Sequence, residues 1–524
     1  MCAVARRGNR PHVTVIKARW GSVGLHHVSL HRFPPLAAMT IEALARREGW
    51  DTAMIDEDAE QLDLDAPTDL VAMTTWTANA PRTYRIAAAY RAKGIPVVMG
   101  GVHPSMLPGE AARHADAVVV GECEAIFGRV LADAAANRLQ QFYEGSWEDL
   151  SLAPTIDELM PRYEQFPRGR YLPTHTTQTT RGCRFNCDFC SVIRIDGRGQ
   201  RHRDPAAVVD ELRIRVKMPG RPPGTPIVVF FTDDDLAADQ EYCGSLFEAM
   251  ASANLPVRFA AQTSIGLARN PELLRLAEAA GAALFFIGFE SVNRQALKEA
   301  NKKNRPAEFA ELVQRLHDAH IAVEGGFILG FDSDGPGAFA DTVRAADEIG
   351  VDTAHFTILT PLPGTQTFSR LHGEGRIFDY DWSHYNAYRT LFEPAQMSVA
   401  MLDAGARWAY GAFYSSSARR RRTWAQIRRS SPMMAAAYRF VGGSYARHYG
   451  VGLQGSSEAP FQPHPDDIAH LATVSNFDAN QVLIEALALA SGGRPSSAGA
   501  ATPVNVSLGR PVAAPTGTTV AGGG

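Results

Sequence analysis

Short apolar runs alternate with longer helical patterns over residues 12–137. The stretches 36–49 and 81–94 show the apolar spacing of amphipathic helices. The strand-like runs between and around them begin near His12, Thr52, Asp69, Pro96 and Ala117. Short strands separated by helices predict βαβ units and a parallel, doubly wound sheet, in which ligands bind beyond the C-terminal ends of the strands.

A second alternation of the same kind begins near Thr174. Helical stretches at 205–218, 271–281 and 306–321 separate its strand-like runs. These runs are 174–180, 226–233, 258–264, 283–289, 322–330 and 354–360. Six β/α units fit a full or partial barrel, and we predict a partial (β/α)6 barrel whose site lies at the C-terminal ends of its strands.

The remaining segments lack this alternation. Several prolines and little periodicity indicate a linker, whereas the region after the barrel combines aromatic residues with helical patterns. The last segment has no aromatic or acidic residue and is expected to be disordered. The α/β fold is therefore divided into a Rossmann-like domain at 11–140, a linker at 141–172, a barrel at 173–375, a helical region at 376–490 and a tail at 491–524.

Composition narrows the classes of protein. The 524 residues are 45% hydrophobic and 21% charged, and 52 basic against 56 acidic residues give a net charge of −4. This balance offers no overall basic field for nucleic acid, and six cysteines in this length do not form a disulfide scaffold. Without a membrane-length apolar run or the apolar core of a signal peptide, we expect a cytoplasmic protein.

The sequence TTRGCRFNCDFCSV places Cys183, Cys187 and Cys190 in a C-x3-C-x2-C array directly after the first strand-like run of the barrel. Three thiolates on one short loop can bind three corners of a cubane 4Fe–4S cluster. The fourth iron then has no protein ligand, and an open metal position is where a substrate or cofactor binds.

Two other interpretations of these cysteines fit the sequence less well. A structural zinc site needs a fourth ligand, and the nearby His175 and His202 lack the usual spacing. Inert buried thiols do not explain three cysteines within eight residues. By contrast, the isolated Cys2, Cys123 and Cys243 are expected to be buried or incidental thiols.

The array resembles the cluster loop of the radical S-adenosylmethionine (SAM) enzymes. In that superfamily SAM chelates the free iron, and its cleavage yields a 5′-deoxyadenosyl radical that abstracts a hydrogen atom from the substrate. The resemblance implies that Phe189, between the last two cysteines, lies near the adenine of SAM.

Five later segments, in order, resemble the strand ends of the same barrel. They are 232–235, 262–264, 288–291, 325–332 and 360–365. The resemblance implies that Gln262 and Ser264 contact the ribose or the substrate. It further implies that Gly288, Glu290 and Ser291 contact the methionine end of SAM and that Leu329 lies in the adenine site.

The first domain resembles the cobalamin-binding domain that precedes the barrel in one class of these enzymes. The matching strand-end residues, implied to bind cobalamin, are Thr74, Thr75, Gly100, Gly101, His103, Gly121 and Glu122. Glycines at such positions allow the backbone to approach a large planar ligand closely. The alternative is a degenerate flavodoxin-like domain that only caps the barrel.

One departure concerns the lower face of cobalt. The motif D-x-H-x-x-G, whose histidine is an axial ligand in many cobalamin proteins, does not occur in this domain. Many members of the radical SAM class also lack it, so cobalamin is still implied. We expect His103 to make a hydrogen bond to the loop or to the nucleotide tail, and the lower axial ligand is unassigned.

The resemblance continues to about residue 430. Trp382, His384 and Tyr385 either approach the substrate or pack in the core. The basic run Arg419–Arg422 beside Trp424 is expected to be a solvated helix, with a lipid surface or a nucleic acid as alternatives. No other cluster supports nucleic acid.

The resemblance implies a C-methyltransferase that acts on an unactivated carbon of a small-molecule or lipid substrate. Its cofactors are a 4Fe–4S cluster, SAM and cobalamin, with a flavodoxin- or ferredoxin-type one-electron donor. One alternative is an oxidative cyclase or another hydrogen-abstracting enzyme that transfers no methyl group. Another is a non-catalytic cobalamin or iron–sulfur sensor. No membrane span is expected, while peripheral membrane contact is left open.

Overall fold

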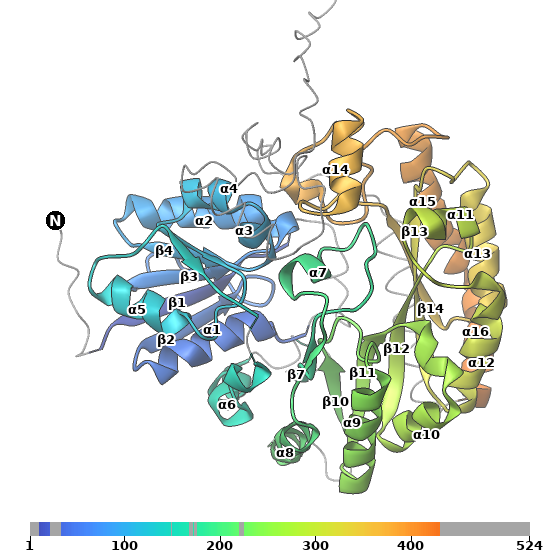
Figure 1. The fold of residues 1–524 in the computed structure, drawn as a ribbon, viewed down its shortest axis with the longest axis horizontal. Coiled ribbons are helices and arrows are strands. Elements are labelled where there is room, and N and C mark those ends of the chain that lie inside the picture. The colour runs from blue at the N-terminus through green and yellow to red at the C-terminus, as the bar shows by residue number, and fades with distance from the viewer. Residues whose placement is uncertain are drawn as a thin grey trace, which may run out of the picture.

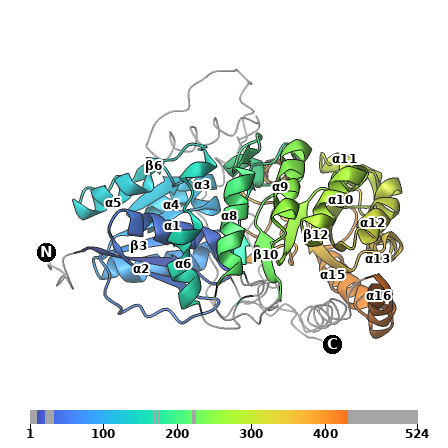
Figure 2. The ribbon, with the colours of Figure 1, turned by 90° about the horizontal axis from the view of Figure 1, so that it is seen from below.

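The computed structural model describes residues 10–20, 33–147, 149–166, 171, 175–218 and 225–429. It contains two six-stranded sheets that lie side by side. Each sheet packs against helices from its own part of the chain (Figures 1 and 2). The predicted tail and the predicted helical segment beyond residue 429 lie outside the described residues.

The first sheet is parallel throughout, in the order β2-β1-β3-β4-β5-β6. Its strands are β1 (His12–Lys17), β2 (Asp51–Asp56), β3 (Leu70–Thr74), β4 (Val97–Gly100), β5 (Ala117–Val120) and β6 (Phe142–Glu144). Helices α1 (Leu36–Arg47) and α5 (Phe127–Ala135) share one hydrophobic core with the sheet. Helices α2 (Ala80–Ala92) and α4 (Pro108–His114) share another.

Alternation along β3 explains the two cores. Leu70 and Ala72 point into the core with α1, whereas Val71 and Met73 point into the core with α2. A strand buried on both faces reads as a continuous apolar run, and all five residues of β3 are buried. The predicted doubly wound sheet is confirmed.

The second sheet is also parallel and follows chain order: β7 (His175–Thr177), β10 (Ile227–Phe231), β11 (Val257–Thr263), β12 (Ala282–Glu290), β13 (Ala322–Leu329) and β14 (Thr353–Ile358). Helices α8 (Pro205–Val216), α9 (Gln240–Ala253), α10 (Pro271–Ala279), α12 (Phe309–Asp318) and α13 (Ala338–Ile349) cover its outer side (Figure 1). The predicted partial (β/α)6 barrel is confirmed.

The range predicted as a linker, 141–172, is more ordered than expected. It contains β6, which extends the first sheet, and α6 (Ile156–Gln165), which packs against α1. A three-residue strand is too short to show alternation, and Pro161 lies inside α6, so neither element gives a clear pattern.

After the barrel come α14 (Gln366–Gly373), a short 3-10 turn at Trp382–His384, α15 (Val399–Phe413) and α16 (Ser416–Arg429). Helix α15 packs against β14 and α13 on the outer side of the barrel. Within the described residues, no helix combines the length and the apolar character needed to cross a bilayer.

Candidate active site

The cysteine loop begins at a glycine that the fold requires. Gly182 has φ +90°, and a Cβ there would overlap the carbonyl oxygen of Gly199 and lie 2.9 Å from that of Asp196. The next residue, Cys183, donates its backbone N–H to the carbonyl of Gly197 at 3.3 Å. The start of the loop is thus folded tightly against residues 196–199.

The rest of the loop is fixed from the far side of the barrel. The side chain of Asn301 donates to the carbonyl of Asn186 at 2.8 Å, and Asp188 N–H donates to the carbonyl of Ala300 at 3.2 Å. Thr367, at the start of α14, donates its N–H to the carbonyl of Asp188 at 3.0 Å. Hydrogen bonds from α11 (Arg294–Glu299), α14 and the residues beside them therefore hold the backbone of the loop in place.

The three thiols of the loop are buried or partly buried and lie near one another. Burial raises the pKa of Cys183 and of Cys190 to about 12, and it also raises the pKa of Cys187. The charge of Cys187 further raises the pKa of both its neighbours, so the three sulfurs are within electrostatic range. Among the described residues no three His, Cys, Asp or Glu side chains are grouped as ligands of a single metal ion. Three neighbouring thiols bound to separate irons fit a cluster.

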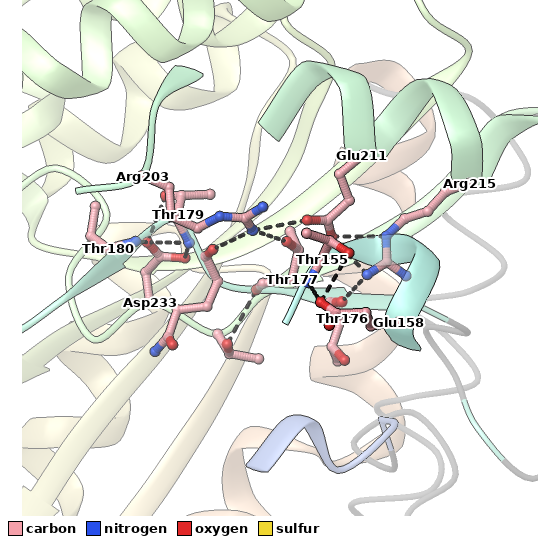
Figure 3. A network of polar contacts seen from close by, with 12 residues as sticks. Thr155, Glu158, Thr176, Thr177, Thr179, Thr180, Arg203, Glu211, Arg215 and Asp233 are labelled. Atoms are coloured by element: carbon pink, nitrogen blue, oxygen red, sulfur yellow. Dashed lines mark hydrogen bonds and ion pairs between the residues drawn. The ribbon is translucent and has the colours of Figure 1, made fainter. Parts of the chain in front are cut away.

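Asp233, at the end of β10, holds the strand that leads into this loop (Figure 3). Its fully buried carboxylate accepts from Thr179 Oγ1 at 2.7 Å, from Thr180 Oγ1 at 2.6 Å and from the backbone N–H groups of both threonines. A single side chain thereby fixes the backbone just before Gly182.

We expect Asp233→Ala to lower the free energy of unfolding by about 3 kcal/mol, because it leaves several buried donors without an acceptor. Urea unfolding of the cofactor-free protein measures this loss. Asp233→Asn, which keeps one oxygen acceptor, should cost less. An alanine variant as stable as the parent would contradict the bracing role.

A second brace beneath the loop was not expected from the sequence (Figure 3). Arg215 donates to the carbonyl of Thr176 and to Glu211, both at 2.7 Å. The other oxygen of Glu211 accepts from Arg203 at 2.8 Å, and Arg203 also donates to the carbonyl of Gln178 at 3.0 Å. The brace joins α8 to the segment between β7 and the cysteines.

Lys302 brings several of the predicted SAM contacts together. Its ammonium lies 3.0 Å from Glu290, and the charges of Glu290, Cys187 and Asp235 all raise its pKa. Asp235 in turn accepts from the N–H of Ser264 at 2.9 Å. The ends of β10, β11 and β12 thus meet beside the cysteine loop. Lys302 gave no sequence signal, because it stands in an ordinary polar run.

Gly288 and Glu290 lie close to each other at the end of β12. Glu290 has φ +64°, an unusual value for this residue type, and a Cβ on Gly288 would overlap its carboxylate. Gln262 lies on β11, where its carbonyl accepts from Leu236 N–H at 2.9 Å. The hydroxyl of Ser291 accepts from Asn293 N–H at 3.0 Å.

The two apolar residues predicted near the adenine differ in position. Phe189 is partly buried and packs against the core of the barrel. Leu329, at the end of β13, has its side chain fully buried in the hydrophobic core of the barrel.

Four of the predicted cobalamin contacts meet at the C-terminal ends of β3 and β4, two central strands of the first sheet. This C-terminal end of the sheet is called the cobalamin edge below. Thr75 donates its N–H to the carbonyl of Gly100 at 2.9 Å, and a Cβ on Gly101 would lie 3.2 Å from Thr74 Oγ1. Gly101 has φ +103°. The Thr75 hydroxyl is buried without a hydrogen-bond partner in the structure. An orphaned hydroxyl beside two glycines fits a ligand that approaches the backbone closely.

His103 belongs to a buried network that reaches the segment after the barrel. His103 Nε2 lies 3.0 Å from Glu110, which also accepts from Tyr84 OH at 2.8 Å and from Trp382 Nε1 at 3.0 Å. All four side chains are buried. The imidazole is completely enclosed, and its Nε2 is hydrogen-bonded within the protein. Trp382 packs here against the first domain.

The last two predicted cobalamin contacts follow β5. Gly121 has φ +82° and donates its N–H to Ser105 Oγ at 3.0 Å. Glu122 lies 3.3 Å from Arg181 and accepts from Arg201 at 2.8 Å, and both arginines belong to the barrel. This end of the first sheet therefore contacts residues that flank the cysteine loop.

Comparison with known proteins agrees with this two-part arrangement. The radical SAM superfamily model matches residues 177–364, and the B12 binding domain model matches residues 24–131. Bacteriochlorophyllide d C-12(1)-methyltransferase of Chlorobaculum tepidum is 32% identical over 371 residues, which cover 69% of this chain and 78% of that protein. The chain belongs to the cobalamin-binding radical SAM enzyme family.

A second relative and a solved structure are also similar to this chain. The C-8(2)-methyltransferase for bacteriochlorophyllide d from the same organism is 27% identical over 64% of this chain and 75% of that protein. The structure of the cobalamin-dependent SAM radical enzyme OxsB with aqua-cobalamin bound superimposes with a TM-score of 0.60 at 13% identity, over 92% of this chain and 75% of that one. The likeness to OxsB shows a shared fold.

Family membership confirms the predicted enzyme class and its cofactors. This cobalamin-binding radical SAM enzyme uses a 4Fe–4S cluster, SAM and cobalamin. The donor sets described above fit them: three thiols on one loop for the cluster, and a glycine-lined strand edge for the corrin. The alternatives of a non-catalytic sensor and of a structural zinc site are thereby set aside.

Proposed function

We propose that this enzyme transfers a methyl group to an unactivated carbon of a tetrapyrrole-type substrate. The observation that carries the proposal is the direct contact between the two halves of the site. Glu122, at the predicted cobalamin edge, is bonded to Arg201, which flanks the cysteine loop, at 2.8 Å. A methyl donor and a hydrogen-abstracting centre need this proximity, because the substrate must reach both from one position.

When bound, the cofactors supply hydrogen-atom abstraction and methyl donation. The residues of the chain bind the cofactors and hold them in place. Cys183, Cys187 and Cys190 would hold the cluster on a loop that backbone bonds already fix. Lys302 and Glu290 keep charged groups at the end of β12, where SAM is expected. Thr75 and the adjoining glycines would hold cobalamin at the edge of the first sheet.

The substrate class rests on the relatives. The two bacteriochlorophyllide methyltransferases act, by their names, on a tetrapyrrole. We therefore take bacteriochlorophyllide d as the first substrate to test. A rigid, largely apolar macrocycle with alkyl side chains offers the unactivated carbons that require radical chemistry.

Anaerobic purification with iron, sulfide and hydroxocobalamin, followed by metal analysis and an optical spectrum, is the first experiment. About four irons per chain with bound corrin support the two-cofactor site. The loaded enzyme is then given bacteriochlorophyllide d and SAM with a deuterated methyl group. A product that carries the labelled methyl, formed together with 5′-deoxyadenosine, supports the proposal. An oxidised product without label would replace it by the cyclase hypothesis, and zinc in place of iron would overturn it.

The proposal includes a flavodoxin- or ferredoxin-type electron donor in a reducing cytoplasm. All five cysteines within the described residues are free thiols, which suits such a compartment. Replacing a chemical reductant by reduced flavodoxin or ferredoxin should sustain 5′-deoxyadenosine formation. If 5′-deoxyadenosine forms with the chemical reductant but with neither reduced flavodoxin nor reduced ferredoxin, this part of the proposal is removed.

Thr75→Val tests the cobalamin edge. We expect about fivefold weaker cobalamin binding, because the variant lacks one hydrogen bond of ordinary strength. The stability of the cofactor-free protein should not fall, since the orphaned hydroxyl contributes nothing there. Absorbance titration with hydroxocobalamin measures the affinity. The matched control is Thr14→Val, in the middle of β1, and equal loss in both variants would contradict a specific contact.

A further inference from the structure

Two arginines of the barrel reach across to two glutamates of the first domain. Arg181, two residues before Cys183, pairs with Glu124 at 2.5 Å and with Glu122 at 3.3 Å. Arg201, on the strand β9 (Arg201–His202) that pairs with β8 (Thr180–Arg181), donates to Glu122 at 2.8 Å. Both carboxylates are buried, so the pairs are shielded from solvent screening.

An aromatic contact from the first domain lies on the same loop. Trp147, which follows β6, donates its indole N–H to the carbonyl of Ile195 at 2.7 Å. A Cβ on Gly197 would lie 3.2 Å from the indole ring, so the two are already in close contact. Gly197 is the residue whose carbonyl accepts from Cys183 N–H. Trp147 therefore packs on the turn that supports the first cluster ligand.

The first-domain side of these contacts is closely packed. A Cβ on Gly121 would lie 2.8 Å from the carbonyl oxygen of Gly145, and one on Gly145 would overlap the backbone of Glu122. Gly145 also donates its N–H to Val120 at 2.8 Å. Glu122 thus extends from two closely packed backbone segments, and a movement of the strand edge would be passed on to the arginines.

We propose that Glu122, Glu124 and Trp147 of the first domain and Arg181, Arg201 and the 195–197 turn of the barrel form a clamp that positions the cobalamin edge over the cluster loop. Its arginines are positioning residues rather than catalytic ones. The proposal rests on the proposed methyl transfer and adds what keeps it coupled to SAM cleavage. SAM cleavage needs only the barrel, whereas methyl transfer needs both halves at a fixed separation.

The charges of the clamp explain why single changes should act strongly. Two carboxylates face two guanidinium groups, and Asp196 lies beside them, where burial raises its pKa to about 6. The carbonyl of Asp196 accepts from Arg201 at 3.1 Å. Removing Arg201 takes one charge-assisted hydrogen bond from the buried carboxylate of Glu122, which keeps its pair with Arg181 at 3.3 Å, and the strand end is then held less firmly against the barrel.

Arg201→Ala is the variant to test, with Arg201→Lys as the conservative partner and Arg275→Ala as the control. Arg275 forms an exposed ion pair with Glu272 on α10 and takes no part in the site. The first readout is hydrogen exchange of the cofactor-free full chain over 117–124 and 180–202. We expect Arg201→Ala to speed exchange about tenfold in both segments, because each loses an anchor. Arg201→Lys should lie between it and the parent.

The second readout is the number of methyl groups transferred per 5′-deoxyadenosine formed by the loaded enzyme. In Arg201→Ala it should fall about 10- to 100-fold, while iron and cobalamin contents stay at the parental level. Unchanged exchange over 117–124 together with an unchanged ratio would overturn the clamp, as would an equal effect in Arg275→Ala. If Arg201→Ala does not fold, Glu124→Gln takes its place. If the parent methylates no tetrapyrrole, the proposed function fails, while hydrogen exchange still decides the clamp.

Discussion

Cys187→Ala should abolish iron loading and 5′-deoxyadenosine formation. The thiol of Cys187 is buried and lies within electrostatic range of the other two cysteines and of Lys302. Its loss leaves two ligands where a cluster with one open iron needs three. Iron analysis and chromatography of the SAM cleavage products measure the two effects.

Cys243→Ala is the matched control for that variant. Cys243 is a fully buried thiol on α9 that belongs to the barrel core. Its replacement should leave iron content and SAM cleavage at parental values, with a small loss of packing. Retained 5′-deoxyadenosine formation in Cys187→Ala would show that the cluster is bound elsewhere.

Trp382→Ala should have the largest effect on stability, a loss of about 4 kcal/mol in the free energy of unfolding. The indole is completely buried, packs against His103 and Tyr385, and donates to Glu110. Truncation creates a cavity between the first domain and the segment after the barrel. Thermal and urea unfolding of the cofactor-free protein measure the loss.

Trp382→Phe separates packing from hydrogen bonding. The phenyl ring fills much of the same space but cannot donate to Glu110, so about 1–2 kcal/mol should be lost. Equal losses in the two variants would mean that the hydrogen bond, rather than the packing, dominates. No loss in either would contradict the assignment of Trp382 to a structural contact between the two parts.

Much of the fold was predictable because local patterns carry it. Every strand of the second sheet overlaps an expected run, since buried parallel strands are short, apolar and bounded by turn residues. The three cysteines were recognisable because their spacing on one loop is itself the chemical feature. The ends of β10, β11 and β12 could be expected to meet because parallel strands place their C-terminal ends at one end of the sheet.

The pairs that join distant parts of the chain were not predictable. Glu110 and Trp382 are 272 residues apart, and Glu122 and Arg201 are 79 apart. A charged or aromatic residue has the same local signal whether its partner is solvent or a remote side chain. Lys302 is a further example, because only the tertiary structure places it beside Cys187 and Glu290. Strand β6 was missed because three residues do not display a period.

Strand β6 also decides how this chain can be recombined with its relatives. It covers the outer edge of β5, and α6 then returns to α1 through a buried pair between Arg162 and Glu42 at 2.8 Å. A chimaera with its crossover at residue 140 would expose β5 as an open edge prone to self-association. A first domain that is to be exchanged between relatives should therefore extend through α6 to residue 166. The protein that receives it needs a tryptophan at the position of Trp382.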